Sequence, residues 1–582
     1  MKTNGKTLAI SALTLVFVLH LFYFAVLNRF HLWNFEQIQF FRFSTGYFSS
    51  FLSDPGGFTN YIGVFFIQFF HFPFWGALIL SLLAVAVFFV SRIIFRKLRF
   101  NGILFPLLPV FILTIVQSNY HYSPIYTFHF LNAIGAFALY VSIQSAKRRY
   151  AVFPAVQIVL FLLSGIYSVL FLVLCFFYEL LFQRTTLSKW AVSVYVMFSV
   201  VLYFFVYRFF YTLPFKPEAV LPEVFFVQPL KKYLVALLAY FPLMLIVVRS
   251  ISQKKNALLA RWNFVNIAAG GLVALLVVFS IATRHYNKKR ELIFKMDYNV
   301  QQQNWDEVLR TAQKYPGVNQ LVVYFTNLAL SQKHELAEKL FAYPQLGKKG
   351  LRLKWERNKV APFYGGEVFY YLQNDNEAFR WAFESMVSNG LHPRGLKRLV
   401  NTSIANGHLL LAEKYLTIIE ESLFYKSWAT DKRRNIAVLL QSAGAKADNP
   451  LCKISADFTA DLKEFDLNLA SLLENCPENS TALGYYMATL LFEKNVREIW
   501  AQVAARQNFE GHEIPTLLEE ALLIYMNNTG ERFIDGGLKI REETYQRFER
   551  FAMTFARNRQ QAARVLEKDF GDTFWYYFYF VQ

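Results

Sequence analysis

Long apolar segments fill the first half of the chain, and they constrain its fold more than any other feature. The run Leu8–Leu27 is followed by apolar runs over 61–90, 102–118, 125–144, 151–182, 190–210, 231–248 and 263–283. Most of them approach or exceed the length that a helix needs to cross a hydrocarbon core of about 30 Å. Backbone polar groups within lipid must be bonded inside the chain, so such runs form helices. The sequence therefore predicts an all-α, multipass transmembrane domain over residues 1–290.

Acidic residues are scarce in the same half. Only Glu36, Asp54, Glu179, Glu218 and Glu223 occur among the first 290 positions, against 25 Lys and Arg residues. The formal net charge of +19 therefore comes from this half. Its basic residues lie in short loops between apolar runs, which is typical of cytoplasmic loops. We expect contact with a lipid bilayer and no nucleic-acid partner.

Three basic clusters orient the predicted helices. They lie at Arg92–Arg99, Lys147–Arg149 and Arg249–Arg261. All three are cytoplasmic if the N-terminus is inside and 151–182 crosses twice, with a break at Ser164–Gly165. We therefore predict nine helices, the first of them an uncleaved span rather than a signal peptide, in a bacterial inner membrane. The C-terminal half then lies in the periplasm, although the basic residues of 284–290 favour the opposite side.

The run 61–90 is too long for one straight crossing. Pro73 lies within it, and proline inside a helix kinks or breaks it. We expect Pro73 either to kink the span or to separate an interfacial helix from it.

From about residue 291 the pattern changes to amphipathic helices separated by turns such as Asn389–Gly390 and Asn406–Gly407. Helices are predicted over 305–314, 318–331, 334–341, 375–388, 394–406, 408–422, 426–441, 481–493, 495–507, 515–528 and 541–568. The spacing of the first pair loosely resembles a tetratricopeptide repeat. We predict a soluble tetratricopeptide-like α-solenoid over 291–582. Such arrays commonly bind peptides or a protein partner, and the alternative is a helical cap on the membrane domain.

Two features of this half leave alternatives open. Cys452 and Cys476 can form a disulfide if this half is outside the cytoplasm, or remain free buried thiols. The aromatic stretch Thr573–Phe580 can lie at the membrane interface or pack inside the last helix pair.

Ionisable residues next to apolar runs are the candidates for chemistry. Glu36 and Asp54 lie in the first predicted outer loop, where an acid can act as a general base or coordinate a metal beside a pyrophosphate. The alternative is an interfacial helix over Phe35–Phe43 with Glu36 facing water. Arg208 and Arg42 are candidates for substrate binding, because a guanidinium suits a lipid phosphate. Arg208 can instead snorkel at its helix end.

The other ionisable groups have structural interpretations. Glu179 can form an interfacial pair with Arg184, and we expect His20 and His71 to be hydrogen-bonded core residues.

The layout resembles that of the C-type (GT-C) glycosyltransferases. The shared features are a first helix with an inside N-terminus, an outer loop carrying an acid, further spans and an external C-terminal domain. Glu36 stands where those enzymes carry an acid, often an Asp-Glu pair. Here the pair is Glu36–Gln37. This departs from a two-acid metal site, and we predict no metal ligands and no particular cofactor.

The chain also resembles an uncharacterised family of bacterial multipass membrane proteins. The segments that carry this resemblance are Pro55-Gly-Gly-Phe with Phe-Ile-Gln68-Phe-Phe, Phe341-Ala-Tyr-Pro-Gln345-Leu-Gly, and Phe570-Gly-Asp-Thr-Phe-Trp575-Tyr. That family implies an architecture rather than an activity.

Our leading hypothesis is a transferase that moves a sugar from a polyprenyl-phosphate donor to a periplasmic acceptor. The resemblance implies that Glu36 or Asp54 acts as base or metal ligand and that Arg208 binds the lipid phosphate. The alternative is a non-enzymatic, membrane-anchored helical-repeat scaffold for envelope assembly. A transporter is less favoured, because these runs carry few polar residues.

Overall fold

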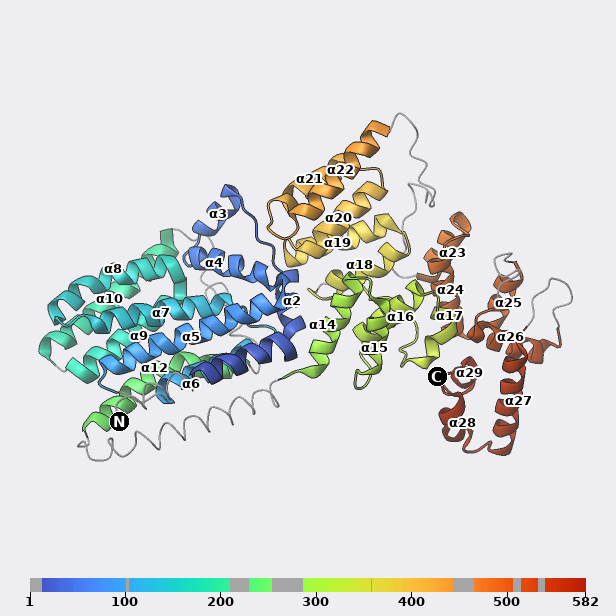
Figure 1. Cartoon of the computed structure of the whole chain (residues 1–582), viewed down its shortest axis with the longest axis horizontal. Coiled ribbons are helices and arrows are strands. Elements are labelled where there is room, and N and C mark those ends of the chain that lie inside the picture. The colour runs from blue at the N-terminus through green and yellow to red at the C-terminus, as the bar shows by residue number, and fades with distance from the viewer. Residues whose placement is uncertain are drawn as a thin grey trace. The chain divides into compact units, whose positions relative to one another are not determined.

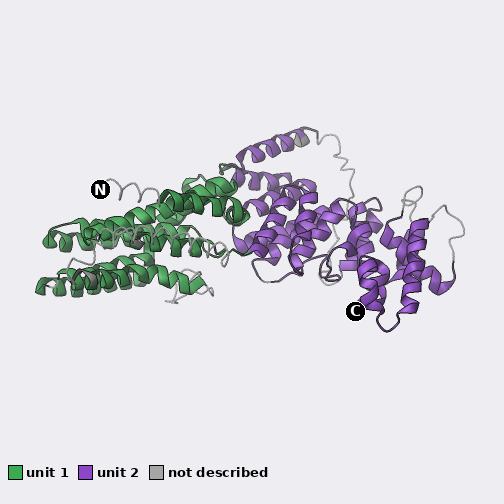
Figure 2. Ribbon diagram, turned by 60° about the horizontal axis from the view of Figure 1, so that its bottom comes forward, with its two compact units in different colours: residues 1–287, 421–424 green, residues 288–420, 425–582 purple. Residues whose placement is uncertain are grey.

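The computed structural model describes residues 13–100, 104–183, 185–209, 230–253, 286–356, 358–442, 465–505, 514–531 and 540–581. Over these ranges the protein is all-α, with 26 α-helices and short 3-10 and π segments. It divides into two compact units (Figure 2). Unit 1 comprises Met1–Asn287 with Glu421–Phe424, and unit 2 comprises Lys288–Glu420 with Tyr425–Gln582.

Unit 1 contains the apolar helices. They are the helix Leu13–Leu27, α2 (Arg29–Gln37), α3 (Thr45–Leu52), α4 (Gly57–Ile67), α5 (Pro73–Lys97), α6 (Leu104–Gln117), α7 (Ile125–Ser142), α8 (Ala146–Ser164), α9 (Ser168–Tyr178), α10 (Thr186–Phe209) and α12 (Leu230–Gln253). In Figure 1 α5, α7, α8, α9 and α10 run side by side. The pairs α5–α6, α5–α7, α7–α8 and α7–α9 pack against each other.

Within the described residues, five helices are long and apolar enough to cross a membrane. The number becomes six if the helix Leu13–Leu27 and α2, which are bent by 69° to each other, form one broken span. The protein is thus a multipass membrane protein. The predicted number of nine spans stays a prediction, because the run 263–283 lies outside the described residues.

One of the five candidates, Ala146–Gln183, folds back on itself. Arg149 at the start of α8 and Glu179 just after α9 form an ion pair of 3.0 Å, so the two helices are antiparallel. Phe153 and Phe171 stack between them at 5.5 Å. The break falls at Gly165, which ends α8 with a φ of +55°. This is the position predicted from the Ser164–Gly165 pair.

The run 61–90 divides into two helices. This agrees with the expectation that Pro73 separates a preceding helix from the span. Helix α4 ends at Ile67, a 3-10 turn η2 covers Gln68–His71, and Pro73 begins α5. Proline is tolerated at the first position of a helix, because its missing N–H has no partner there in any case. Pro73 therefore starts the span instead of kinking it.

The apolar side chains of unit 1 divide between a core and a lipid-facing surface. A core cluster joins α5, α6, α7, α9 and α12 through buried residues such as Val87, Leu113 and Phe137. In contrast, α10 exposes Trp190, Met197, Phe204 and Phe209, each between 66% and 69%. A contiguous exposed apolar face of this kind is the surface that a bilayer covers.

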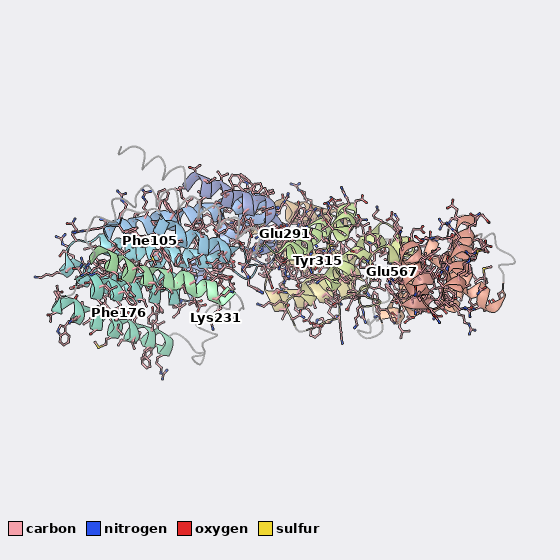
Figure 3. The ribbon with its side chains drawn as sticks, turned by 90° about the horizontal axis from the view of Figure 1, so that it is seen from below. Phe105, Phe176, Lys231, Glu291, Tyr315 and Glu567 are labelled. Carbon is pink, nitrogen blue, oxygen red and sulfur yellow. The ribbon has the colours of Figure 1, made fainter. Side chains whose placement is uncertain are left out.

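Unit 2 is an array of shorter helices. They are α14 (Lys288–Gln301), α15 (Trp305–Gln313), α16 (Gln320–Gln332), α17 (Leu336–Lys339), α18 (Ala361–Tyr371), α19 (Asp375–Asn389), α20 (Pro393–Ala405), α21 (Leu409–Glu420), α22 (Lys426–Ser442), α23 (Phe465–Asn475), α24 (Ser480–Glu493), α25 (Val496–Ala505), α26 (Thr516–Thr529), α27 (Glu542–Arg557), α28 (Ala562–Phe570) and α29 (Phe574–Phe580). From α18 to α22 each helix packs against the next. The helical C-terminal half is thus confirmed. In Figure 3 the labelled residues Phe105 and Phe176 belong to unit 1, and Glu291 and Glu567 belong to unit 2.

The last helices of unit 2 correct one predicted element. The segment 541–568 is two helices, not one, because α27 ends at Arg557 and α28 begins at Ala562. The break allows α28 to fold back against α27 and α29 and to bury Leu566 and Phe570.

The terminal aromatic stretch packs inside unit 2. Phe574 and Trp575 of α29 are fully buried, and the Trp575 indole donates to the carbonyl of Glu520 over 2.9 Å. Of the two interpretations of this stretch, internal packing is therefore the one that the structure supports.

Candidate functional site

Glu36 is a buried acid on a helix that turns sharply away from the first apolar helix. It lies on α2, its residue is 3% exposed, and its Oε2 accepts a hydrogen bond of 2.7 Å from the Gln37 side chain. The His71 Nδ1 lies 3.8 Å from the same oxygen. A carboxylate removed from water in this way requires polar partners, and two are present.

The local sequence explains why α2 turns. The first helix ends in a π-helical turn over Tyr23–Leu27, and the Asn28 N–H closes it by donating to the Tyr23 carbonyl over 2.9 Å. Helix α2 then buries its apolar side chains in a cluster with Phe24, Phe70 and Ala77. The interfacial helix over Phe35–Phe43 with Glu36 facing water is therefore wrong, because α2 ends at Gln37 and encloses Glu36 among these apolar neighbours.

Asp54 is exposed in the turn between α3 and α4. Two glycines fix this turn against the tip of the α8–α9 hairpin. Gly56, with a φ of +90°, donates its N–H to the Leu162 carbonyl over 2.9 Å. A Cβ on Gly165 would lie 2.8 Å from the Pro55 carbonyl oxygen, so only glycine allows this approach. The turn thus presents Asp54 to solvent from a rigid backbone.

The two candidate acids lie on different elements. Helix α2 packs against η1, η2 and α5, whereas α3 packs against α4. Glu36 is enclosed by the protein, whereas Asp54 is open to solvent.

The two candidate arginines also differ in their surroundings. Arg42 Nη1 lies 3.5 Å from Glu421 Oε2, within unit 1, and its guanidinium lies 5.0 Å from the Tyr47 ring. Arg208 is exposed near the C-terminal end of α10, with its guanidinium 5.9 Å from the Phe209 ring. Of the two, Arg208 has the more open guanidinium.

Glu179 forms the centre of a buried structural cluster. It accepts hydrogen bonds from Arg149, from the Tyr140 hydroxyl at 2.9 Å and from the Tyr150 hydroxyl at 3.1 Å. The expected partner Arg184 lies outside the described residues. The partner that the structure describes is Arg149, because the α8–α9 hairpin brings these distant positions together.

Of the two histidine expectations, the one for His20 holds, whereas the side chain of His71 is 29% exposed, so His71 is not a core residue. His20 contacts the Ser81 hydroxyl at 2.9 Å and the Gln117 amide oxygen at 3.3 Å, all of them buried. These contacts join the first helix to α5 and α6 and make His20 a hydrogen-bonded core residue.

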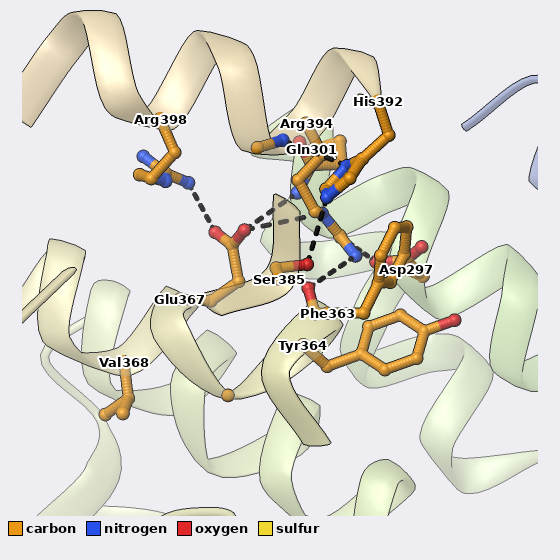
Figure 4. Close-up of polar contacts among 12 residues, drawn as sticks. Asp297, Gln301, Phe363, Tyr364, Glu367, Val368, Ser385, His392, Arg394 and Arg398 are labelled. Carbon is orange, nitrogen blue, oxygen red and sulfur yellow. Dashed lines mark hydrogen bonds and ion pairs between the residues drawn. The ribbon is translucent and has the colours of Figure 1, made fainter. Parts of the chain in front are cut away.

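Unit 2 contains a buried ionic network that the sequence did not reveal (Figure 4). Arg394 on α20 pairs with Asp297 on α14, and Arg398 donates to Glu367 on α18 over 2.5 Å. Gln301 also donates to Glu367, over 3.2 Å. Burial raises the pKa of Asp297 to about 6, even though Arg394 opposes the shift. Burial also acts to raise the pKa of Glu367, but Arg398 and Arg394 outweigh it and hold that pKa below its usual value.

The network surrounds the start of α20. His392 caps this helix by accepting from the Gly395 N–H over 3.1 Å, and its other ring nitrogen contacts the Ser385 hydroxyl at 2.9 Å. Burial lowers the pKa of His392 to about 3. The adjoining cavity encloses about 20 Å³, which is room for about one water molecule. This cluster therefore holds four helices together, α14, α18, α19 and α20.

The described part of the chain contains few groups suited to metal binding or thiol chemistry. Its residues contain no group of three or more His, Cys, Asp or Glu side chains placed to hold a metal. Cys175 is a buried free thiol, and Cys476 is disulfide-bonded. Cys452, the remaining cysteine of the sequence, lies outside the described residues.

A family model matches residues 6–581, which is almost the whole chain. The chain belongs to the DUF6057 family, a family of unknown function. No curated protein and no solved structure matches it. In this DUF6057 protein, one of the segments that carry the family resemblance, 341–347, has a packing role: Phe341 stacks on Tyr577 at 4.6 Å, and Gln345 exchanges two hydrogen bonds of 3.1 Å with Asn327.

Proposed function

We propose that this DUF6057 protein transfers a sugar from a polyprenyl-phosphate donor to an acceptor at the outer face of the membrane, with Glu36 as general base. The observation that carries the proposal is the placement of Glu36. It is enclosed on a helix bent by 69° from the first apolar helix, next to an imidazole and an amide. Glycosyl transfer requires the acceptor hydroxyl to lose its proton, and a positioned carboxylate is suited to accept it.

The other candidate residues have complementary roles in this proposal. Arg208, exposed near the end of an apolar helix, is suited to the lipid phosphate because a guanidinium binds phosphate oxygens in a bidentate way. Asp54, exposed on a rigid turn, is suited to the hydroxyls of the acceptor. Arg42 is already paired with Glu421 and would bind substrate only by exchanging that partner.

The disulfide at Cys476 supports the proposed side of the membrane. Disulfides form and persist outside the reducing cytoplasm. We therefore propose that unit 2 lies in the periplasm of a bacterium and that the N-terminus lies in the cytoplasm, in agreement with the three basic clusters.

The variant Glu36→Gln tests the proposed base. The full-length protein in liposomes receives a tritiated hexose on a short polyprenyl phosphate, together with an envelope extract as the source of acceptor. We expect transfer to fall by about 100-fold or more, because a general base contributes at least that factor. The unfolding temperature of Glu36→Gln is measured alongside, so that a loss of transfer is distinguished from a loss of folding. Wild-type transfer by Glu36→Gln, or no transfer by the wild-type protein, would contradict the proposal.

Glu179→Gln is the matched control in the same unit. It replaces a second buried acid, but one that holds the Arg149 guanidinium between α8 and α9. Removing one partner of a buried ion pair costs about 3–5 kcal/mol, so this variant should lower the unfolding temperature. Its transfer rate per folded molecule should remain close to that of the wild type.

A second candidate function rests on the surface of unit 2. Phe383 and Val387 on α19 and Leu410 on α21 are exposed apolar side chains, and Leu410 is 82% exposed. On a tetratricopeptide-like array such side chains would bind a protein partner of the cell envelope. Cross-linking in whole membranes distinguishes this scaffold function: Val387→Asp with Leu410→Asp should abolish one specific cross-linked product. Its persistence would contradict partner binding through these residues.

A further inference from the structure

His71 faces the proposed catalytic acid from the neighbouring element. Its Nδ1 lies 3.8 Å from Glu36 Oε2, and its side chain is 29% exposed while that of Glu36 is 4% exposed. The imidazole is fixed from two sides. It stacks on Phe424 at 5.2 Å with an interplanar angle of 3°, and it meets the edge of Phe72 at 4.9 Å. The two aromatic contacts therefore fix the position of His71, while part of its side chain remains exposed to solvent.

The elements packed around α2 provide several titratable groups. Tyr23 lies on η1, His71 on η2, and Arg92, Arg96 and Lys97 on α5, while α2 itself carries Arg29 and His31. The basic residues of α5 begin 19 positions after Pro73, which corresponds to about 28 Å along a helix. Arg29 is exposed, and its guanidinium lies over the Phe30 ring. Among these groups, His71 lies within ion-pair distance of the carboxylate.

We infer that His71 is a positioning residue that keeps Glu36 ionised and oriented as a base. The ionised form of a carboxylate is less stable inside a protein than in water unless an opposite charge is near. A protonated imidazole supplies such a charge. The imidazole of His71 is partly open to solvent, whereas the Glu36 carboxylate is enclosed. The catalytic consequence rests on the proposed function, whereas the pairing itself does not.

A double-mutant cycle tests the pairing without any assay of transfer. Unfolding temperatures of the full-length wild type, Glu36→Gln, His71→Gln and the double variant are measured in detergent at pH 5.5 and pH 8.5. Histidine is protonated below about pH 6.5, so the two substitutions should be non-additive at pH 5.5 and close to additive at pH 8.5. Additivity at both values would overturn the inference. If Glu36→Gln retains transfer while the cycle shows coupling, the pairing stands and the proposed base fails.

The pH dependence of transfer tests the positioning role. His71→Gln should move the acid limb of the rate profile to higher pH by about one unit, because a nearby positive charge favours the ionised carboxylate. His71→Lys restores a positive charge and should return the limb toward its original position. His129→Gln is the matched control, since His129 is buried against Asn60 at 2.9 Å and belongs to α7. An unmoved limb in His71→Gln would overturn the positioning role.

Discussion

Two adjacent glutamates in α26 show how strongly the surroundings of a single residue decide its chemistry. Glu519 is paired with the Arg541 guanidinium at 3.0 Å and also accepts from the Thr544 hydroxyl. Glu520 instead accepts a hydrogen bond of 2.6 Å from the Phe574 backbone N–H. Burial raises the pKa of Glu520 to about 8. At neutral pH Glu520 is therefore a protonated group inside the last helices of unit 2.

Glu520→Gln should flatten the dependence of stability on pH. The folded state keeps the proton up to about pH 8, while the unfolded chain releases it near the ordinary value of 4.5. Glu520 therefore makes the free energy of unfolding fall as pH rises from 5 to 9. Thermal unfolding over this range should show a smaller slope for Glu520→Gln than for the wild type.

Glu519→Gln is the control for this prediction. It should lower the unfolding temperature by removing the partner of Arg541, yet keep the slope, because Glu520 is still present. An equal slope for Glu520→Gln and the wild type would contradict the assignment of this dependence to Glu520.

At the residue scale, the sequence identified some site residues and missed their partners. The scarcity of acids in the first half drew attention to Glu36, and Glu36 is indeed enclosed beside the spans. Its contact with His71 depends on how α2 and η2 pack, and 35 positions separate the two residues. Similarly, the chain neighbour Arg184 is the partner that the sequence predicts for Glu179, and it lies outside the described residues, whereas the contact with Arg149 follows only from the antiparallel hairpin. The type and position of a residue can be read from the sequence, whereas these pairings depend on how the helices pack in the tertiary structure.

At the element scale, the α8–α9 hairpin gives a direct test. Gly165→Ala places a Cβ 2.8 Å from the Pro55 carbonyl at a φ of +55°. A residue held in this backbone region costs about 1–3 kcal/mol, so the unfolding temperature should fall. The same change should loosen the turn that carries Asp54.

Gly135→Ala is the matched control for Gly165→Ala. A Cβ there meets no atom within 4 Å, and Gly135 lies inside α7. Replacing glycine by alanine within a helix stabilises it by up to about 1 kcal/mol. Equal unfolding temperatures for the two variants would contradict a strained approach at Gly165.

Element boundaries were predictable where turn residues and helix periodicity agreed, as at α19, α20 and α22. Helix α18 was missed because Gly365 and Gly366 in its interior are poor helix formers. Both approach Trp381 so closely that a Cβ would lie 2.4 Å and 2.8 Å from its side-chain atoms. The close packing of α18 against Trp381 thus requires glycine at both positions. From a single sequence, such a glycine pair cannot be distinguished from a turn.

At the scale of the whole molecule, hydropathy and charge predicted the main division. The change in composition near residue 290 corresponds to the boundary between the two compact units at Asn287 and Lys288. Apolar runs predicted helices, because lipid leaves the backbone no other partner. Which side unit 2 occupies depends on loop charges that conflict, with three clusters against the basic residues of 284–290. Orientation therefore stays a prediction.

The proposed function requires Glu36 and unit 2 to lie on the outer side of the membrane. Single cysteines at His121, Arg148 and Val318, all exposed, allow side-specific labelling with a membrane-impermeant maleimide. The native thiols interfere little, because Cys175 is buried and Cys476 is disulfide-bonded. For the proposed orientation, we expect positions 121 and 318 to react in cells with a permeabilised outer membrane, and position 148 to react only after lysis. Reaction of position 148 in intact cells, with 121 and 318 protected until lysis, would contradict it.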